Sequence, residues 1–173
     1  MNTVGARLLL SVLVVFIVSA NSAAAQIVAL GASNTQGRGV SPDEAWPTVL
    51  ESMLHARGSS VHVANAGING DTTGGELARL DSAVPDGTRV VILNFGRNDF
   101  KRGKHGGGAI SSDMRQANVA KILSELHRRR IRTIEADGMI DSIRAAGMVQ
   151  ADGIHLTAEG HRRVAARLVG LVR

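Results

Sequence analysis

The chain has 173 residues, a net charge of +5 at pH 7 and no cysteine. The lack of cysteine excludes disulfides and a thiol nucleophile, so we expect packing to supply the stability. The basic run His127-Arg128-Arg129-Arg130 does not predict nucleic-acid binding, because it falls at the end of a predicted helix, where cations are favoured, and the chain has only one tryptophan and three phenylalanines for base stacking.

Residues 1–25 have the layout of a secretory signal peptide. Arg7 is followed by an apolar stretch over 8–20 and then by Ala23-Ala24-Ala25, small residues that suit signal peptidase. The apolar stretch is shorter than the roughly 20 residues that span a bilayer. We therefore predict cleavage after the alanines, one domain over 26–173, no stable membrane span after cleavage, and a periplasmic or secreted location.

Apolar, β-branched runs alternate with segments of helical period along the rest of the chain. The runs predict buried strands over 26–30, 61–64, 89–93 and 130–134. The helical segments predict helices over 47–57 with Gly58 as the stop, from Thr73 with Glu76 completing a capping box, over 112–129, and over 157–171. This alternation predicts a three-layer α/β/α sandwich with a mostly parallel central sheet.

Polar segments follow the first three predicted strands. Ser33 follows the first strand, Gly67 the second and Asn98 the third. Because functional loops of a parallel sheet lie at the carboxyl ends of its strands, we expect these three residues at one edge. Asp152 and His155 lie on one short loop before the last predicted helix, from which His155 could reach Ser33.

These residue types suit acyl transfer. A serine hydroxyl needs a nearby base, and the base needs a partner that holds its tautomer. We predict Ser33 as the nucleophile, His155 as the base and Asp152 as the acid that orients it. The backbone N–H groups of Ser33 and Gly67 and the side-chain amide of Asn98 are suitable oxyanion donors. Glycine at position 67 should let the backbone approach the substrate closely.

The segments around these residues resemble the SGNH hydrolase superfamily, also called the GDSL esterases and lipases. The stretch over 65–73, Gly96-Arg97-Asn98-Asp99 and Asp152-Gly153-Ile154-His155 are similar to its bacterial lysophospholipase, arylesterase and thioesterase-like branch. The resemblance implies a flavodoxin-like sandwich, the same triad and oxyanion hole, and no metal or cofactor. The first block departs from the family, because Ala32 stands where a carboxylate usually helps to hold the nucleophile loop, so we expect altered loop support or activity.

Together with the signal-peptide pattern, the resemblance implies a secreted or periplasmic serine esterase that acts on short acyl, aryl or lysophospholipid-type esters. One alternative is a carbohydrate or peptidoglycan O-acetylesterase, which the same site could serve. Another is an inactive envelope-binding module, for which Ala32 is the only hint in the sequence. The expected partner is a small-molecule or glycan ester, without nucleic acid, and the sequence does not predict an oligomeric state.

Other titratable residues have less direct interpretations. Asp71 and Asp99 compete with the predicted acid, but their places in the motifs indicate hydrogen-bonding support of loops. His161 lies six positions after His155 and is expected on the surface, and the remaining histidines show no spacing typical of metal ligands. The glycine-rich, basic stretch over 101–108 predicts a flexible surface loop beside the site.

Overall fold

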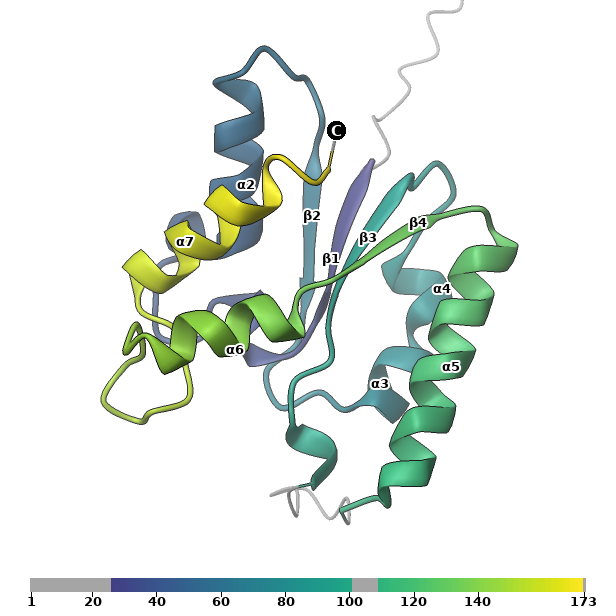
Figure 1. Cartoon of the computed structure of the whole chain (residues 1–173). Coiled ribbons are helices and arrows are strands. Elements are labelled where there is room, and N and C mark those ends of the chain that lie inside the picture. Colours follow the sequence, from purple (N-terminus) through teal and green to yellow (C-terminus); the bar gives the residue numbers. More distant parts are fainter. Residues whose placement is uncertain (1–25, 101–108, 173) are drawn as a thin grey trace, which may run out of the picture.

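The structure is a computed structural model that describes residues 26–100 and 109–172 (Figure 1). The predicted signal peptide and the predicted loop over 101–108 lie outside the described residues. Four strands form a parallel sheet in the order β2-β1-β3-β4. Their bounds are Ile27–Gly31 for β1, Val63–Gly67 for β2, Val90–Asn94 for β3 and Arg132–Glu135 for β4.

Helices cover both faces of this sheet. Their bounds are Ser33–Gln36 (α1), Trp46–His55 (α2), Thr73–Ala78 (α3), Leu80–Ala83 (α4), Ser112–Arg128 (α5), Asp137–Ala145 (α6) and Ala158–Leu168 (α7), with short 3₁₀ turns at Pro42–Glu44 and Asn98–Phe100. Figure 1 shows α2, α6 and α7 on one side of the sheet and α3, α4 and α5 on the other. The predicted three-layer α/β/α architecture is confirmed.

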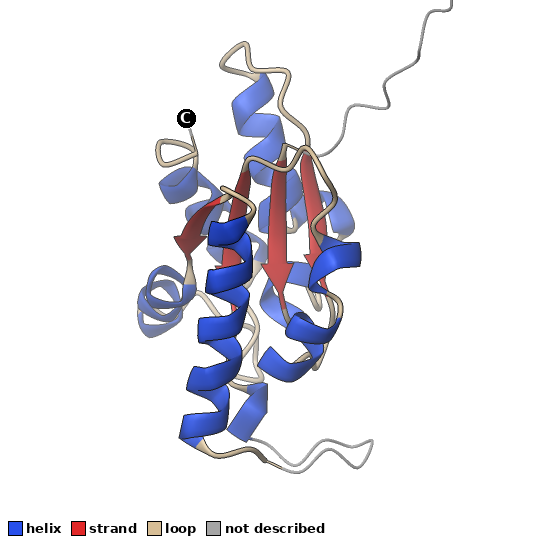
Figure 2. Cartoon of the chain, turned by 90° about the vertical axis from the view of Figure 1, so that its right-hand side faces the viewer, coloured by secondary structure: helices blue, strands red, loops and turns tan. Residues whose placement is uncertain are grey.

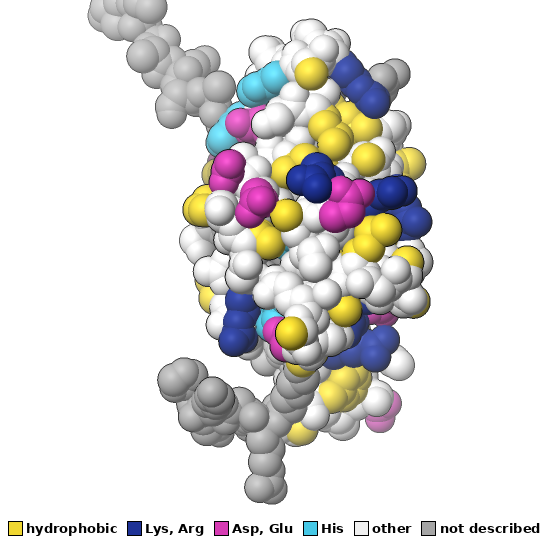
Figure 3. All heavy atoms as spheres, turned by 90° about the vertical axis from the view of Figure 1, so that its left-hand side faces the viewer, with side chains coloured by type: hydrophobic (Ala, Val, Ile, Leu, Met, Phe, Trp, Pro, Cys, Tyr) yellow, Lys and Arg dark blue, Asp and Glu magenta, His cyan; other side chains and the backbone are white. Residues whose placement is uncertain are grey.

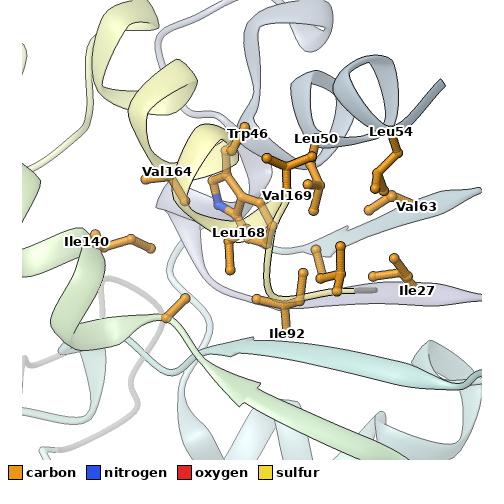
Figure 4. Packing of buried hydrophobic residues seen from close by; sticks show 14 of the residues in the cluster. Ile27, Trp46, Leu50, Leu54, Val63, Ile92, Ile140, Val164, Leu168 and Val169 are labelled. Carbon is orange, nitrogen blue, oxygen red and sulfur yellow. The ribbon is translucent and has the colours of Figure 1, made fainter. Parts of the chain in front are cut away.

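The two central strands, β1 and β3, are buried along their whole length. Because successive side chains of a strand point to opposite faces, Ile27 and Ala29 enter the core under α2, α6 and α7, whereas Val28 and Leu30 enter the core under α4 and α5. Trp46, at the start of α2, is fully buried in the first core (Figure 4). Burial on both faces explains why these strands read as continuous apolar runs.

The strand ends lie level at one edge of the sheet. Gly31 pairs in register with Gly67 on β2 and with Asn94 on β3. The arrowheads of the strands therefore point to the same edge, which is the lower one in Figure 2. The loops that follow Gly31, Gly67 and Asn94 meet there, as the sequence predicted.

Besides the short helix α1 and the 3₁₀ turns, which the sequence did not predict, two elements differ from the sequence prediction. Strand β2 continues through Asn65-Ala66-Gly67 although asparagine and glycine have low strand propensity, because pairing with β1 extends to its end. Helix α6 was not predicted, since Gly138 in its first turn weakens the helical signal. It forms because it buries Ile140 and Ile143 against the sheet.

The predicted capping box of Thr73 and Glu76 is wrong. The N-cap of α3 is Thr72, whose side-chain oxygen accepts a hydrogen bond from the Gly75 N–H at 3.2 Å. The Thr73 hydroxyl instead donates to Asp99 Oδ1 at 2.9 Å. Glu76 turns inward and is fully buried, so it does not reach back to the start of the helix as a capping-box glutamate does. The real cap lies one residue before the position that the motif predicted.

On the side of the molecule that carries α2 and α7, basic and acidic side chains are interspersed with apolar ones (Figure 3). None of the helices over 26–100 and 109–172 is long and apolar enough to cross a membrane.

Candidate active site

Ser33, Asp152 and His155 form one hydrogen-bonded chain. His155 Nε2 lies 3.0 Å from Ser33 Oγ, and His155 Nδ1 lies 2.5 Å from Asp152 Oδ2. The Ser33 side chain comes from the first residue of α1, and the other two come from the loop before α7. The structure therefore brings Ser33 together with two residues that lie more than a hundred positions later in the sequence.

The partners of His155 determine its tautomer. An ionised carboxylate only accepts hydrogen bonds, so the hydrogen of the neutral imidazole lies on Nδ1, where Asp152 accepts it. Nε2 is then the acceptor, and the Ser33 hydroxyl donates to it. The hydrogen bond from the His155 side chain, followed by those from the backbone N–H groups of His155 and Ile154, holds the pKa of Asp152 well below its usual range.

Asn34 joins the nucleophile loop to the loop that carries His155. Its Oδ1 accepts from the Leu156 N–H at 3.0 Å, and its Nδ2 donates to the Ile154 carbonyl at 3.4 Å. These bonds clamp both sides of His155 to the residue next to Ser33. The sequence analysis did not select Asn34, and its only signal there is its place directly after the serine.

The three predicted oxyanion donors differ in their availability. The Ser33 N–H has no acceptor among the described residues. Asn98 Nδ2 donates one hydrogen to the Asp71 carbonyl at 2.7 Å, which leaves its second hydrogen. The Gly67 N–H donates to Asn65 Oδ1 at 3.0 Å, so this donor is already engaged.

Gly67 is required by its contact with α1. A Cβ atom at this position would lie 2.2 Å from the backbone nitrogen of Gln36, in the helix that begins with Ser33. The sequence analysis attributed this glycine to a close approach of the substrate. The structure adds a packing reason, which is that β2 and the nucleophile helix touch backbone to backbone.

Asp71 and Asp99 support loops, as predicted. Asp71 Oδ1 accepts from the Thr72 N–H at 2.9 Å, and its Oδ2 pairs with Arg79 Nε at 2.8 Å. Asp99, which is almost fully buried, accepts from the Thr73 N–H and hydroxyl and pairs with Arg115. Both carboxylates are thus engaged away from His155.

A pocket of about 420 Å³ opens beside Ser33. Its wall includes Asn98 and three apolar side chains, those of Phe100, Ile140 and Ile154. Phe100 and Ile154 are 51% and 38% exposed, so the pocket is open to solvent at this side.

His161 is buried, and its predicted surface position is wrong. Its side chain is fully covered, and its Nδ1 accepts a hydrogen bond from the Trp46 N–H at 3.2 Å. Burial lowers the pKa of His161 to about 4. Spacing from His155 gave no information on burial, because the cover comes from α2, far away in the sequence.

Over the described ranges, no group of three or more His, Asp or Glu side chains is placed to hold a metal ion.

The model of the GDSL-like Lipase/Acylhydrolase family matches residues 29–148, which is more than half of the chain. The chain belongs to this family. The matched range contains Ser33, Gly67 and Asn98, whereas Asp152 and His155 lie just beyond it. The geometry connects these last two residues to the GDSL-like core.

The GDSL-like chain is similar to two bacterial esterases. It is 39% identical over 100 residues to an arylesterase of Vibrio mimicus (55% of this chain, 48% of that one) and 31% identical over 99 residues to esterase TesA of Pseudomonas aeruginosa (57% and 49%). The matches thus span about half the length of these relatives. A crystal structure of TesA has the same fold, with a TM-score of 0.72 at 21% identity over 85% of this chain and 97% of that one.

Proposed function

We propose that this protein is a serine esterase that hydrolyses carboxylic esters through an acyl-enzyme on Ser33. The observation that carries the proposal is the chain of hydrogen bonds from Ser33 Oγ through His155 to Asp152. Such a chain supplies the base and the orienting acid that a serine nucleophile needs. Membership of the GDSL-like family and the esterase names of the two relatives support the same reaction class.

In the first half of the reaction, Ser33 Oγ attacks the ester carbonyl carbon while His155 Nε2 takes the hydroxyl proton. The carbonyl π electrons move to oxygen, and a tetrahedral intermediate forms. The intermediate then collapses, the bond to the alcohol oxygen breaks, and His155 returns the proton to this leaving group. Asp152 stabilises the imidazolium between the two transfers, because its carboxylate stays on Nδ1.

In the second half, a water molecule replaces the alcohol beside His155. His155 removes a proton from this water as the oxygen attacks the acyl carbon on Ser33. The new tetrahedral intermediate releases the carboxylic acid, and the proton returns to Ser33 Oγ. The open pocket supports this step, because water can reach the acyl group from the exposed side.

The negative oxygen of each intermediate needs hydrogen-bond donors. We assign this role to the Ser33 N–H, the remaining amide hydrogen of Asn98 and the Gly67 N–H. The last of these has to exchange Asn65 Oδ1 for the substrate oxygen. The exchange is favourable because an anionic oxygen is a stronger acceptor than a neutral amide oxygen.

The pocket wall and the N-terminal segment each favour one kind of substrate and one location. The apolar wall of Phe100, Ile140 and Ile154 favours short acyl or aryl groups. The signal-peptide pattern over 1–25 favours a periplasmic or secreted enzyme.

Asp152→Asn is expected to lower kcat for an aryl ester by about 10²-fold. The amide offers His155 Nδ1 either a donor or a weaker acceptor, so the productive tautomer is lost. The expected loss is below that of a buried triad acid, because the Asp152 side chain is 43% exposed and water replaces part of its effect. Hydrolysis of p-nitrophenyl acetate and butyrate measures this change.

Asp71→Asn is the matched comparison for Asp152→Asn. Its carboxylate supports the loop before α3 and does not contact His155, so we expect a loss of kcat of no more than about tenfold. Equal losses in the two variants, measured where both are folded, contradict the assignment of Asp152.

A further inference from the structure

A carboxylate that the sequence analysis did not select contacts the loop between β3 and Asn98. Asp137 is the first residue of α6, and its Oδ1 accepts from Asn94 Nδ2 at 2.7 Å and from the Gly96 N–H at 3.0 Å. Its Oδ2 accepts from the Phe95 N–H at 3.1 Å. Donors from three consecutive residues therefore converge on one side chain.

The same carboxylate is connected to the nucleophile helix. Asn94, held by Asp137, accepts a buried hydrogen bond from the Thr35 hydroxyl through its Oδ1 at 3.3 Å. Thr35 lies in α1, two residues after Ser33. The Asn94 side chain thus bridges Asp137 to the helix that carries the nucleophile.

The loop held by Asp137 needs such support. Gly96 has a φ of +61°, a left-handed conformation, and it leads directly to Asn98. A Cβ atom on Gly96 would lie 3.8 Å from the Cβ of Ala32, so the nucleophile loop packs here. Ala32 has no side-chain oxygen that could accept from the N–H groups of Phe95 and Gly96. Asp137 of α6 accepts both hydrogen bonds.

Building on the esterase function proposed above, we infer that Asp137 is a positioning residue that fixes Asn98 relative to Ser33. It acts through the backbone of Phe95 and Gly96 and through Asn94. An error of about 1 Å in the position of a catalytic group can cost about 10²-fold in rate. Asp137 therefore contributes to kcat through the placement of the oxyanion donor.

The test is Asp137→Asn in the full chain, with a p-nitrophenyl ester as the substrate. An amide has one acceptor oxygen where the carboxylate has two, and its NH₂ group faces a donor. Asp137 also lines the pocket, but asparagine has nearly the same size, so the shape of the pocket is kept. We therefore expect kcat to fall by about tenfold to hundredfold and KM to change by less than about twofold. Because an unfolded fraction also lowers the apparent kcat without changing KM, kcat is calculated from the concentration of folded protein measured by circular dichroism.

The matched control is Glu135→Gln, which removes an exposed carboxylate two positions earlier and should leave kcat unchanged. If Asp137→Asn does not fold, Asp137→Glu serves instead, because it keeps the charge and displaces the acceptor atoms by one methylene. An unchanged kcat in the folded variant overturns the inference and leaves the esterase function standing. A wild-type protein without ester turnover overturns the proposed function, and the inference fails with it.

Discussion

Replacing His155 with alanine is expected to lower kcat for ester hydrolysis by about 10⁴-fold or more. Its Nε2 is 3.0 Å from Ser33 Oγ, which makes it the proton acceptor for the attack and the proton donor for the leaving alcohol. Both steps are lost together in the variant, whereas the oxyanion donors remain and leave a small residual rate. The loss is measured as hydrolysis of an aryl ester at pH 8. The variant is assayed at a much higher enzyme concentration than the wild type, so that its slow rate is measurable.

His127→Ala is the control for this experiment. His127 is an exposed histidine in the last turn of α5, and it should be replaceable without an effect on kcat. Comparable rates for His155→Ala and the wild type contradict the role of His155 as the base. They would mean that any turnover comes from another site.

Replacing Glu76 with glutamine is expected to stabilise the protein by about 3 kcal/mol at pH 7. Glu76 is fully buried, and neither of its carboxylate oxygens has a hydrogen-bond partner among the described residues. Burial, with a smaller contribution from Asp71, raises the pKa of Glu76 to about 9. The side chain is therefore a neutral acid in the folded protein at pH 7, and glutamine has nearly the same shape without the titrating proton.

The sign of the pH dependence follows from the two states of Glu76. Below pH 4.5 both the folded and the unfolded chain hold the proton, so the titration of Glu76 does not change the free energy of unfolding. Between pH 4.5 and about 9 the unfolded chain releases the proton and the folded chain keeps it, so the wild type loses stability by up to about 1.4 kcal/mol per pH unit. The glutamine variant has no such loss, and its advantage grows with pH over this window.

Urea unfolding of both proteins at pH 5, 7 and 8.5 tests the Glu76 prediction. The difference in the free energy of unfolding should be small at pH 5 and should increase at each higher pH. Glu135→Gln, on the surface, should show no such trend. A difference that stays constant with pH would show that the folded protein does not raise the pKa of Glu76, and it would contradict the prediction.

Much of the fold and of the candidate site follows from local sequence features. The continuous apolar runs around Val28 and Val91 identify the buried central strands, because such strands are covered on both faces. The parallel arrangement then places Ser33 and Asn98 at one edge. The short spacing between Asp152 and His155 is enough to place an acid against the imidazole on one loop.

The remaining features depend on contacts between distant segments. The cover over His161 comes from α2, and Glu76 is buried although its position matches a capping motif that would place it at the surface, so neither burial has a local pattern. The role of Asp137 becomes visible only through its hydrogen bonds to the backbone N–H groups of Phe95 and Gly96, just after β3. Backbone donors leave almost no trace in the sequence, because any residue except proline can supply them.

Labelling with a fluorophosphonate, which phosphonylates activated serines with loss of fluoride, is the most direct test of the serine-nucleophile mechanism. Intact mass and peptide mapping of the purified protein would locate the label. We expect stoichiometric modification at Ser33 and its loss in His155→Ala, because the Ser33 hydroxyl is activated through His155 Nε2. A folded protein that takes up no label at Ser33, or that is labelled equally without His155, contradicts the account.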